Sequence, residues 1–369
     1  MQPACHGPPI AFSVPMAHDP GGHRLLVGTY TKASSRGIYT LALAAGTGAL
    51  SGPELAAEAP NPTFMALSPD RSLLYAVCAG DSWASSFRAD AATGRLEPIQ
   101  QMPAGPGPTP CHIAVDPTGR IALAANYHLA LAAAIPLGGD GSIGTPRVVA
   151  HSGRGTHPSR QASAHVHSAN FSPDARHAIV CDLGLDRIYS YRLDREKVAL
   201  LPGDPPFIES SPGAGPRHLA FGRGGRHAYA INEIDNTIVA YDYLPANGGL
   251  VRLQAVSVLP TGYRGEATAA EVKVHPNGRF VYGSSRGPDT IAVFAVHEAT
   301  GTLTPVEVVP CGGKGPRSFA LSPDGLWLVC AHQYSGTLCS FGIDARTGRL
   351  SRIPGTVEVS MPVCAVFLS

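Results

Sequence analysis

The chain has 369 residues and a formal net charge of +1 at pH 7, and only 15% of its residues are charged. Overall charge therefore does not attract it to nucleic acid or to an anionic membrane surface, so any recognition of an anion has to be local. No apolar run approaches the roughly 18–20 residues of a membrane-spanning helix, and a chain of this length can form one unit if it is built from repeats.

The N-terminal segment, residues 1–22, lacks a basic start and has only a short apolar patch interrupted by Pro, which is a poor match to a secretion signal. We expect a flexible extension over residues 1–22, a single domain over residues 23–369, and a cytoplasmic location. The eight cysteines form no C-x-x-C pair, and most lie in apolar runs. This pattern predicts buried, reduced thiols rather than a zinc ribbon or a redox motif.

Six hairpins follow one another along the domain, each with two runs of β-forming residues around a turn of the Pro-Asp-Gly type. They are FMALSPDRSLLYAVCAG, IAVDPTGRIALAANY, ANFSPDARHAIVCDLG, LAFGRGGRHAYAINE, VKVHPNGRFVYGSSRG and FALSPDGLWLVCAHQ. Their turn markers recur every 47 to 56 residues, at Pro69, Pro117, Pro173, Arg223, Pro276 and Pro323. Repeats of about 40–50 residues with four short strands each predict the blades of a β-propeller.

The two ends of the chain complete a seventh unit. The C-terminal PVCAVFLS resembles the first strand of the repeat, and RLLVGTYTKASSRGIYTLAL, from residue 24, resembles the second and third strands. The sequence therefore predicts an all-β, seven-bladed β-propeller whose ring is closed by a C-terminal inner strand joined to N-terminal strands. These complementary ends disfavour an open solenoid or two stacked sandwiches.

Chemistry is expected at one rim of the central channel. Strands one and two of a blade are antiparallel, so the start of the first and the end of the second meet at the same rim. Residues five or six before each turn marker, and nine or ten after it, therefore converge there. His, Arg and Glu are concentrated in the hairpins from residue 167 onwards, whereas the hairpin around Pro69 is bland. This skew predicts a polar, cationic pocket on one side of the mouth.

Three arginines of this rim, Arg217, Arg286 and Arg317, suit the binding of a carboxylate or phosphate and the stabilisation of an oxyanion. The alternative is that each simply pairs with a channel carboxylate, of which Glu233, Glu271 and Asp182 are the candidates.

His167 suits general acid or base catalysis, and Glu233 suits orienting that histidine or activating water. The alternatives are a rim histidine with satisfied hydrogen bonds and an ion pair between Glu233 and Arg217. His165 and His167 also form H-x-H, which with His112 or Asp182 is a candidate zinc site, although H-x-H is common by chance. The loop-like stretch 151–167 around this motif lengthens one repeat and is a candidate lid over the mouth.

Four segments resemble the lactonase family of seven-bladed propellers, which includes propeller-type 6-phosphogluconolactonases and carboxy-muconate cyclases. These segments are HVHSANFSPDARHAIVCDLGLDRIYSY, GPRHLAFGRGGRHAYAINEIDNTIVAYDY, AAEVKVHPNGRFVYGSSRGPDTIAVF and GPRSFALSPDGLWLVCAHQ. The resemblance spans roughly residues 24–369. It implies a catalytic cluster of His167, Arg217, Glu233 and Arg286. The other rim residues would bind substrate, namely His112, Asn126, Asp182, His218, Asn232, Glu271, Arg317 and Gln333. The chain departs from the family pattern at Ser285-Arg286-Gly287 and at His332-Gln333, which bears on the identity of the substrate.

The expected activity is metal-independent and cofactor-independent hydrolysis of a small anionic lactone, most specifically 6-phosphogluconolactone. A muconate-type lactonising cyclase and a non-catalytic, protein-binding propeller are the alternatives. A small anionic substrate is the expected partner, with no nucleic acid and no membrane, and the protein is expected to be a monomer or a weak homodimer.

Overall fold

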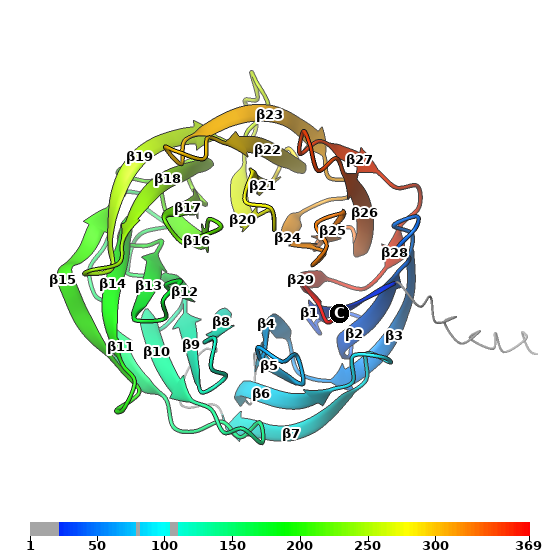
Figure 1. Cartoon of the computed structure of the whole chain (residues 1–369), viewed down its shortest axis with the longest axis horizontal. Coiled ribbons are helices and arrows are strands. Elements are labelled where there is room, and N and C mark those ends of the chain that lie inside the picture. The colour runs from blue at the N-terminus through cyan, green and yellow to red at the C-terminus, as the bar shows by residue number, and fades with distance from the viewer. Residues whose placement is uncertain (1–21, 79–81, 104–109) are drawn as a thin grey trace, which may run out of the picture.

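The computed structural model describes residues 22–78, 82–103 and 110–369. Seven sheets stand in a ring around a central channel, and these described residues contain no helix (Figure 1). The predicted all-β, seven-bladed propeller is confirmed. It follows that nothing in the described part of the chain is a helix long and apolar enough to cross a membrane. The extension predicted over residues 1–22 lies, apart from Gly22, outside the described residues.

The sheets are numbered here as blades 1 to 7, and their strands are given from the channel outwards. Blade 1 contains β29 (Pro362–Phe367), β1 (His23–Thr29), β2 (Gly37–Leu43) and β3 (Leu50–Glu58). Blade 2 contains β4 (Pro62–Leu67), β5 (Leu73–Cys78), β6 (Ser82–Ala89) and β7 (Leu96–Pro103). Blade 3 contains β8 (His112–Val115), β9 (Ile121–Asn126), β10 (Leu131–Pro136) and β11 (Arg147–Ala150).

The remaining blades repeat the same order. Blade 4 contains β12 (Val166–Phe171), β13 (His177–Asp182), β14 (Arg187–Asp194) and β15 (Ala199–Glu209). Blade 5 contains β16 (Pro216–Phe221), β17 (His227–Asn232), β18 (Thr237–Leu244) and β19 (Gly249–Ser257). Blade 6 contains β20 (Thr268–Val274), β21 (Phe280–Arg286), β22 (Thr290–Val296) and β23 (Leu303–Pro310). Blade 7 contains β24 (Pro316–Leu321), β25 (Trp327–His332), β26 (Thr337–Ile343) and β27 (Leu350–Arg352), with β28 (Val357–Glu358) paired to β26.

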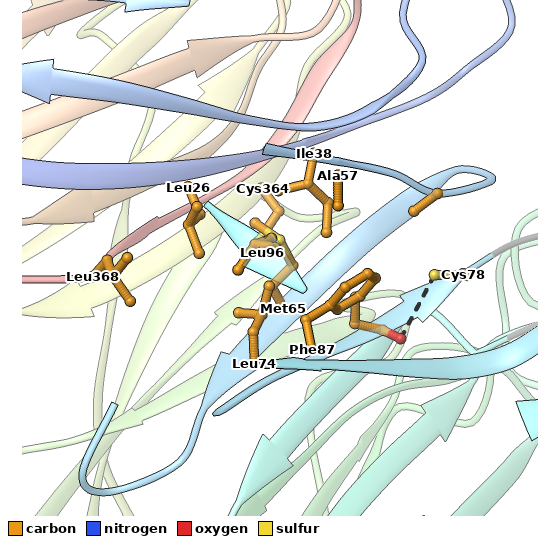
Figure 2. Packing of buried hydrophobic residues seen from close by; sticks show 12 residues of the cluster. Leu26, Ile38, Ala57, Met65, Leu74, Cys78, Phe87, Leu96, Cys364 and Leu368 are labelled. Atoms are coloured by element: carbon orange, nitrogen blue, oxygen red, sulfur yellow. Dashed lines mark hydrogen bonds between the residues drawn. The ribbon is translucent and has the colours of Figure 1, made fainter. Parts of the chain in front are cut away.

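The ring closes as predicted. The C-terminal strand β29 pairs antiparallel with the N-terminal strand β1, with Phe367 opposite Leu25. The contact extends into the next blade, because Cys364 of β29 packs in one apolar cluster with Leu26 of β1 and Met65 of β4 (Figure 2). The junction of the two chain ends is therefore buried between blades 1 and 2, and burial of this apolar surface stabilises the closed ring.

The predicted turn between the first and second strands is held by side chains as well as by the backbone. In blade 4 the Ser172 hydroxyl donates to Asp174 Oδ1 at 2.6 Å and accepts from the backbone amide of His177 at 2.9 Å. Ser322 and Asp324 repeat this arrangement in blade 7. Ser-Pro-Asp therefore forms the turn because Pro fixes the backbone while Ser and Asp satisfy the amides of the corner.

A β-bulge at the start of the inner strand aims the side chains of the rim. Val166 pairs with Asp182 and Ser168 with Cys181, so His167 is an extra residue with no direct partner on β13. Arg217 occupies the same extra position in blade 5, and Arg317 occupies it in blade 7. Bulges redirect side chains and are frequent beside functional sites, and here they place the His and Arg residues of three blades at the same level of the channel.

Candidate functional site

The four residues expected to be catalytic come together at the mouth, and Glu233 is their centre. This residue directly follows β17, and its Oε2 accepts a hydrogen bond from Arg217 Nε at 2.8 Å and forms an ion pair with Arg286 Nη2 at 3.1 Å. Nε2 of His167 lies 4.0 Å from the same oxygen. The side chains are almost completely buried, with Arg217 2% and Glu233 6% exposed. Three blades thus build one compact group of opposite charges.

Electrostatics hold this group in a defined protonation state. Burial alone would raise the pKa of Glu233, but the charges of Arg286 and Arg217 keep it well below its ordinary value. Burial, together with repulsion from Arg317, lowers the pKa of Arg217 to about 10, which still leaves it protonated at neutral pH. Glu233 is therefore a carboxylate and a weak base.

The imidazole of His167 is neutral by the same reasoning. Burial lowers its pKa well below the ordinary value, and the nearby charge of Arg217 lowers it further. Its Nδ1 is buried and has no hydrogen-bond partner among the described residues. A buried, neutral imidazole with an unpartnered nitrogen can accept a proton from a small molecule that reaches it.

Arg317 and Gln333 lie at neighbouring strand ends on the blade 7 side of the site. The guanidinium of Arg317 lies 5.9 Å from the ring centre of Tyr30, and no carboxylate in the described part of the chain pairs with it. Its charge also acts on Arg217 and on Arg286. Gln333 presents a buried Oε1 without a partner among the described residues. Both side chains are available to a ligand.

Three further candidates fill the channel beside the cluster. Nδ1 of His218 lies 3.0 Å from Glu271 Oε1, and the His218 ring lies 5.2 Å from the ring of His167. The rings of His112, His218 and Phe64 pack against one another, with His112 5.4 Å from His218 and 4.4 Å from Phe64. Burial lowers the pKa of His112 to about 3, so this imidazole is neutral. These buried rings pack beside the Glu233 cluster and give it a low-dielectric wall.

Three further residues expected to bind substrate, Asn126, Asp182 and Asn232, form hydrogen bonds in turns. Asn126 Oδ1 accepts from the amide of Leu129 at 2.9 Å, and Asn232 Nδ2 donates to Thr237 Oγ1 at 2.9 Å. Asp182 Oδ2 lies 2.6 Å from His151 Nδ1, while its Oδ1 accepts from two backbone amides. All three residues stand nine positions after their turn marker, where the strand enters its next turn.

The loop over residues 151–165 contributes an arginine that the repeat pattern did not single out. The guanidinium of Arg160 donates to Glu233 Oε1 and also bonds Tyr127. Gln161 fixes this loop, because its Oε1 accepts the amide of His157 at 2.8 Å and its Nε2 donates to Asp186 Oδ1 at 2.6 Å. Tyr127 lies ten residues after a turn marker, as Glu233 does, so the repeat pattern places it at the rim. Arg160 has no such periodic signal.

The zinc alternative for H-x-H is not supported by the geometry. Nδ1 of His165 faces the carbonyl oxygen of Tyr127 at 3.0 Å, and the His165 ring stacks on the Tyr127 ring at 4.2 Å. Within the described residues, the one compact group of metal-ligating atoms is formed instead by Cys311, Cys330 and His332.

Comparison with known proteins agrees with the fold. The family model described as "Lactonase, 7-bladed beta-propeller" matches residues 24–367. A 6-phosphogluconolactonase of Bacillus subtilis is 38% identical over 345 residues, which cover 93% of this chain and 97% of that protein. The structure of a periplasmic gluconolactonase of Pseudomonas aeruginosa aligns with a TM-score of 0.87 and 33% identity, covering 94% of this chain and 99% of that one. The chain belongs to the lactonase family of seven-bladed β-propellers.

Proposed function

We propose that the protein is a lactonase that hydrolyses a small anionic sugar lactone, most specifically 6-phosphogluconolactone to 6-phosphogluconate. The names of its relatives support this substrate class. The observation that carries the proposal is the buried, neutral imidazole of His167 with an unpartnered nitrogen, beside arginines gathered on one carboxylate.

The anionic group of the substrate is bound by the arginines whose positive charge is not fully neutralised by a carboxylate. Arg317 has no carboxylate partner in the described residues, and Arg160 shares Glu233 with two other arginines. Guanidinium groups bind phosphate through two parallel hydrogen bonds. We assign the phosphate to Arg317 and Arg160, and a ring hydroxyl of the sugar to the Oε1 of Gln333.

Hydrolysis then needs a base for water and donors for the oxyanion. His167 takes one proton from water as the oxygen attacks the lactone carbonyl, and Arg286 and Arg217 stabilise the negative charge that develops on the carbonyl oxygen. The ring C–O bond breaks, and the imidazolium returns its proton to the departing ring oxygen, which becomes a hydroxyl. The water oxygen remains in the carboxylic acid of the product, which then loses the second water proton to solvent and becomes a carboxylate.

Glu233 has a supporting role in this scheme. We propose His167 rather than Glu233 as the base, because the carboxylate of Glu233 is held by ion pairs with Arg217 and Arg286 and its pKa is lowered. We propose that Glu233 aligns Arg217, Arg286 and Arg160 so that they face the carbonyl. His112, His218 and Glu271 exclude water from one side, while Asn126, Asp182 and Asn232 keep the strand ends in place.

The same geometry argues against the cyclase alternative. Lactonising cyclisation needs an acid that protonates the substrate, and the lowered pKa of His167 makes its protonated form scarce at neutral pH. A protein-binding propeller would present an apolar patch at the mouth, whereas the mouth is formed by charged groups.

The direct test is hydrolysis of 6-phosphogluconolactone, followed above its spontaneous rate, by the wild-type protein and by His167→Gln. Loss of about 100-fold or more in kcat is expected for a missing general base. His297→Ala is the matched control, because His297 is exposed on an outer turn of blade 6. If His167→Gln hydrolyses the lactone at the wild-type rate, the assignment is wrong, and activity on carboxy-muconate alone would support the cyclase.

We also propose a cytoplasmic location. The described cysteines are free thiols, and all but one of them are buried, which suits a reducing compartment. Cell fractionation tests this. The Pseudomonas aeruginosa neighbour is named periplasmic, so recovery of this protein from the periplasm would contradict the proposal.

A further inference from the structure

Sulfur and imidazole groups gather between blades 6 and 7, outside the arginine cluster. Cys311 directly follows β23, Cys330 lies within β25, and His332 ends β25. One ligand atom from each lies within 4.8 Å of the other two, and all three residues are buried. The two blades neighbour each other in the ring (Figure 1), and their shared apolar core contains both cysteines.

Cys339 of β26 supplies a fourth candidate ligand. It stands directly opposite Cys330 in the strand register. Its Sγ lies 4.0 Å from His332 Nε2 and donates to the carbonyl oxygen of Cys311 at 3.0 Å. Cys339 therefore borders the group formed by Cys311, Cys330 and His332, although it does not belong to the set of atoms that lie within 4.8 Å of one another.

The spacing approaches that of a tetrahedral metal site. Zn–S bonds of about 2.3 Å and Zn–N bonds of about 2.0–2.1 Å put neighbouring ligand atoms roughly 3.5–3.8 Å apart. The 4.0 Å between Cys339 Sγ and His332 Nε2 is close to this separation. The ligand atoms of Cys311, Cys330 and His332 lie within 4.8 Å of one another, so coordination would draw them closer together.

The histidine is already oriented as a ligand. His332 Nδ1 faces the carbonyl oxygen of Thr337 at 3.0 Å, and the opposite nitrogen, Nε2, points toward the sulfurs. Metal-ligating histidines usually donate their other ring N–H to a carbonyl or carboxylate, which fixes the ring and the tautomer. At present Nε2 lies 2.9 Å from the Cys311 carbonyl oxygen, a contact that coordination would replace.

We propose that Cys311, Cys330, Cys339 and His332 form a closed structural site for a thiophilic divalent cation, for which zinc is the best fit. Thiolate and imidazole ligands in a tetrahedral arrangement are typical of structural zinc. On binding, each coordinating thiol releases its proton to solvent and forms one metal–sulfur bond, while His332 binds as neutral imidazole. No oxidation is involved.

The metal site would connect the two strand ends of blade 7 that carry the proposed substrate-binding residues Arg317 and Gln333. Cys311 begins the segment that leads to Arg317, and His332 precedes Gln333. The backbone amide of Gln333 also donates to Gly315 in that segment at 2.9 Å. A metal ion would therefore hold blade 6 to blade 7 and fix the position of the Arg317 segment, whatever the substrate.

Two other states of the same cluster make different predictions. One is a disulfide between two of the cysteines. The other is a metal-free pair of thiolate and imidazolium formed by Cys311 and His332. A hydrogen bond from Cys330 lowers the pKa of Cys311 to about 5. Burial lowers the pKa of His332, but hydrogen bonds and charges from Cys311 and Cys339 raise it to about 10.

The experiment measures metal content directly, without any lactone. The full chain, expressed with zinc and purified under reducing conditions without chelator, is expected to hold one zinc per molecule by elemental mass spectrometry. Cobalt substitution should give the intense visible bands of tetrahedral cobalt and a thiolate charge-transfer band. Cys339→Ser and His332→Gln should each lower the bound zinc at least 10-fold. Cys181→Ser and Cys364→Ser, which alter buried cysteines of blades 4 and 1, should leave it unchanged.

A second measurement covers variants that fold poorly. Wild-type protein stripped with a chelator should unfold at a lower temperature and exchange the amides of residues 312–317 faster, and zinc should reverse both changes. Zinc content equal in wild type and Cys339→Ser would overturn the proposal. So would a wild-type mass lower by two hydrogens that reductant restores, or metal-free wild-type protein with a rapidly alkylated cysteine.

Discussion

A buried carboxylate ends the second strand of blade 4 and another directly follows the second strand of blade 5, and the two carboxylates have different partners. Asp182, nine residues after its turn marker, bonds His151 and the backbone amides of a turn. Glu233, ten residues after its marker, bonds Arg217, Arg286 and Arg160. One step along the chain therefore separates a group that shapes a turn from one that faces the channel, as expected where successive side chains point in opposite directions.

A substitution in blade 5 should cause the largest losses of catalytic rate and of stability. Arg217→Ala leaves the carboxylate of Glu233 buried with one fewer partner and removes an oxyanion donor. We expect kcat for the lactone to fall about 100- to 1,000-fold, and the free energy of unfolding to fall by about 3–5 kcal/mol. Lactone assays and denaturant titration measure the two losses.

Arg349→Ala is the control for this prediction, because Arg349 pairs with Glu307 at 2.8 Å in an exposed position. Exposed ion pairs contribute about 0–1 kcal/mol. Equal losses of stability in the two variants would show that the Arg217–Glu233 pair behaves as a surface pair, contrary to its burial.

Neutralising each carboxylate separates the two roles. Glu233→Gln should reduce kcat by about 10- to 100-fold through misaligned arginines, and it should also lower stability, because Arg217 and Arg286 stay buried without their carboxylate. Asp182→Asn should lower stability by about 1–3 kcal/mol, because His151 and two amides lose a charged acceptor, but it should leave kcat close to that of the wild type. Thermal unfolding and lactone kinetics on both variants check this. A loss of kcat in Asp182→Asn as large as that in Glu233→Gln would contradict the separation.

The sequence was sufficient for the fold, because each hairpin carries its own alternation and its own Ser-Pro-Asp or Gly-rich corner, and the two ends are visibly parts of one unit. It was also sufficient to bring His167, Arg217, Glu233 and Arg286 to one rim. The sequence did not show whether the ninth or the tenth residue after a turn marker faces the channel. That depends on the strand register and on bulges formed with a neighbouring strand. Arg160 and His151 come from a loop without a repeat, and the Cys311 cluster is assembled from two blades, so neither has a local pattern.

The neutral imidazoles make stability depend on pH. His112, His167 and His218 have pKa values lowered by burial, to about 3 for His112. Below the ordinary histidine pKa the unfolded chain binds protons that the folded chain does not, so stability is lost as pH falls below about 6.5, at up to about 1.4 kcal/mol per pH unit for each histidine. Denaturant titration between pH 7.5 and 5 measures this loss. His112→Gln should reduce the slope, and an unchanged slope would mean that His112 is protonated in the folded protein.

The smallest expected effect on lactone kinetics comes from Arg160, in the loop over residues 151–165, which lies outside the repeat pattern. Arg160 is partly exposed and is one of three arginines on Glu233. If it binds the phosphate of the substrate, Arg160→Ala should raise KM for 6-phosphogluconolactone several-fold, leave kcat within about threefold, and have little effect on the unphosphorylated lactone, since the lost contact is made equally in the ground and transition states. Arg154→Ala, an exposed arginine of the same loop, is the matched control. An equal loss on both lactones would assign Arg160 to the alignment of Glu233 instead, and would leave Arg317 as the sole phosphate ligand among the described arginines of the mouth.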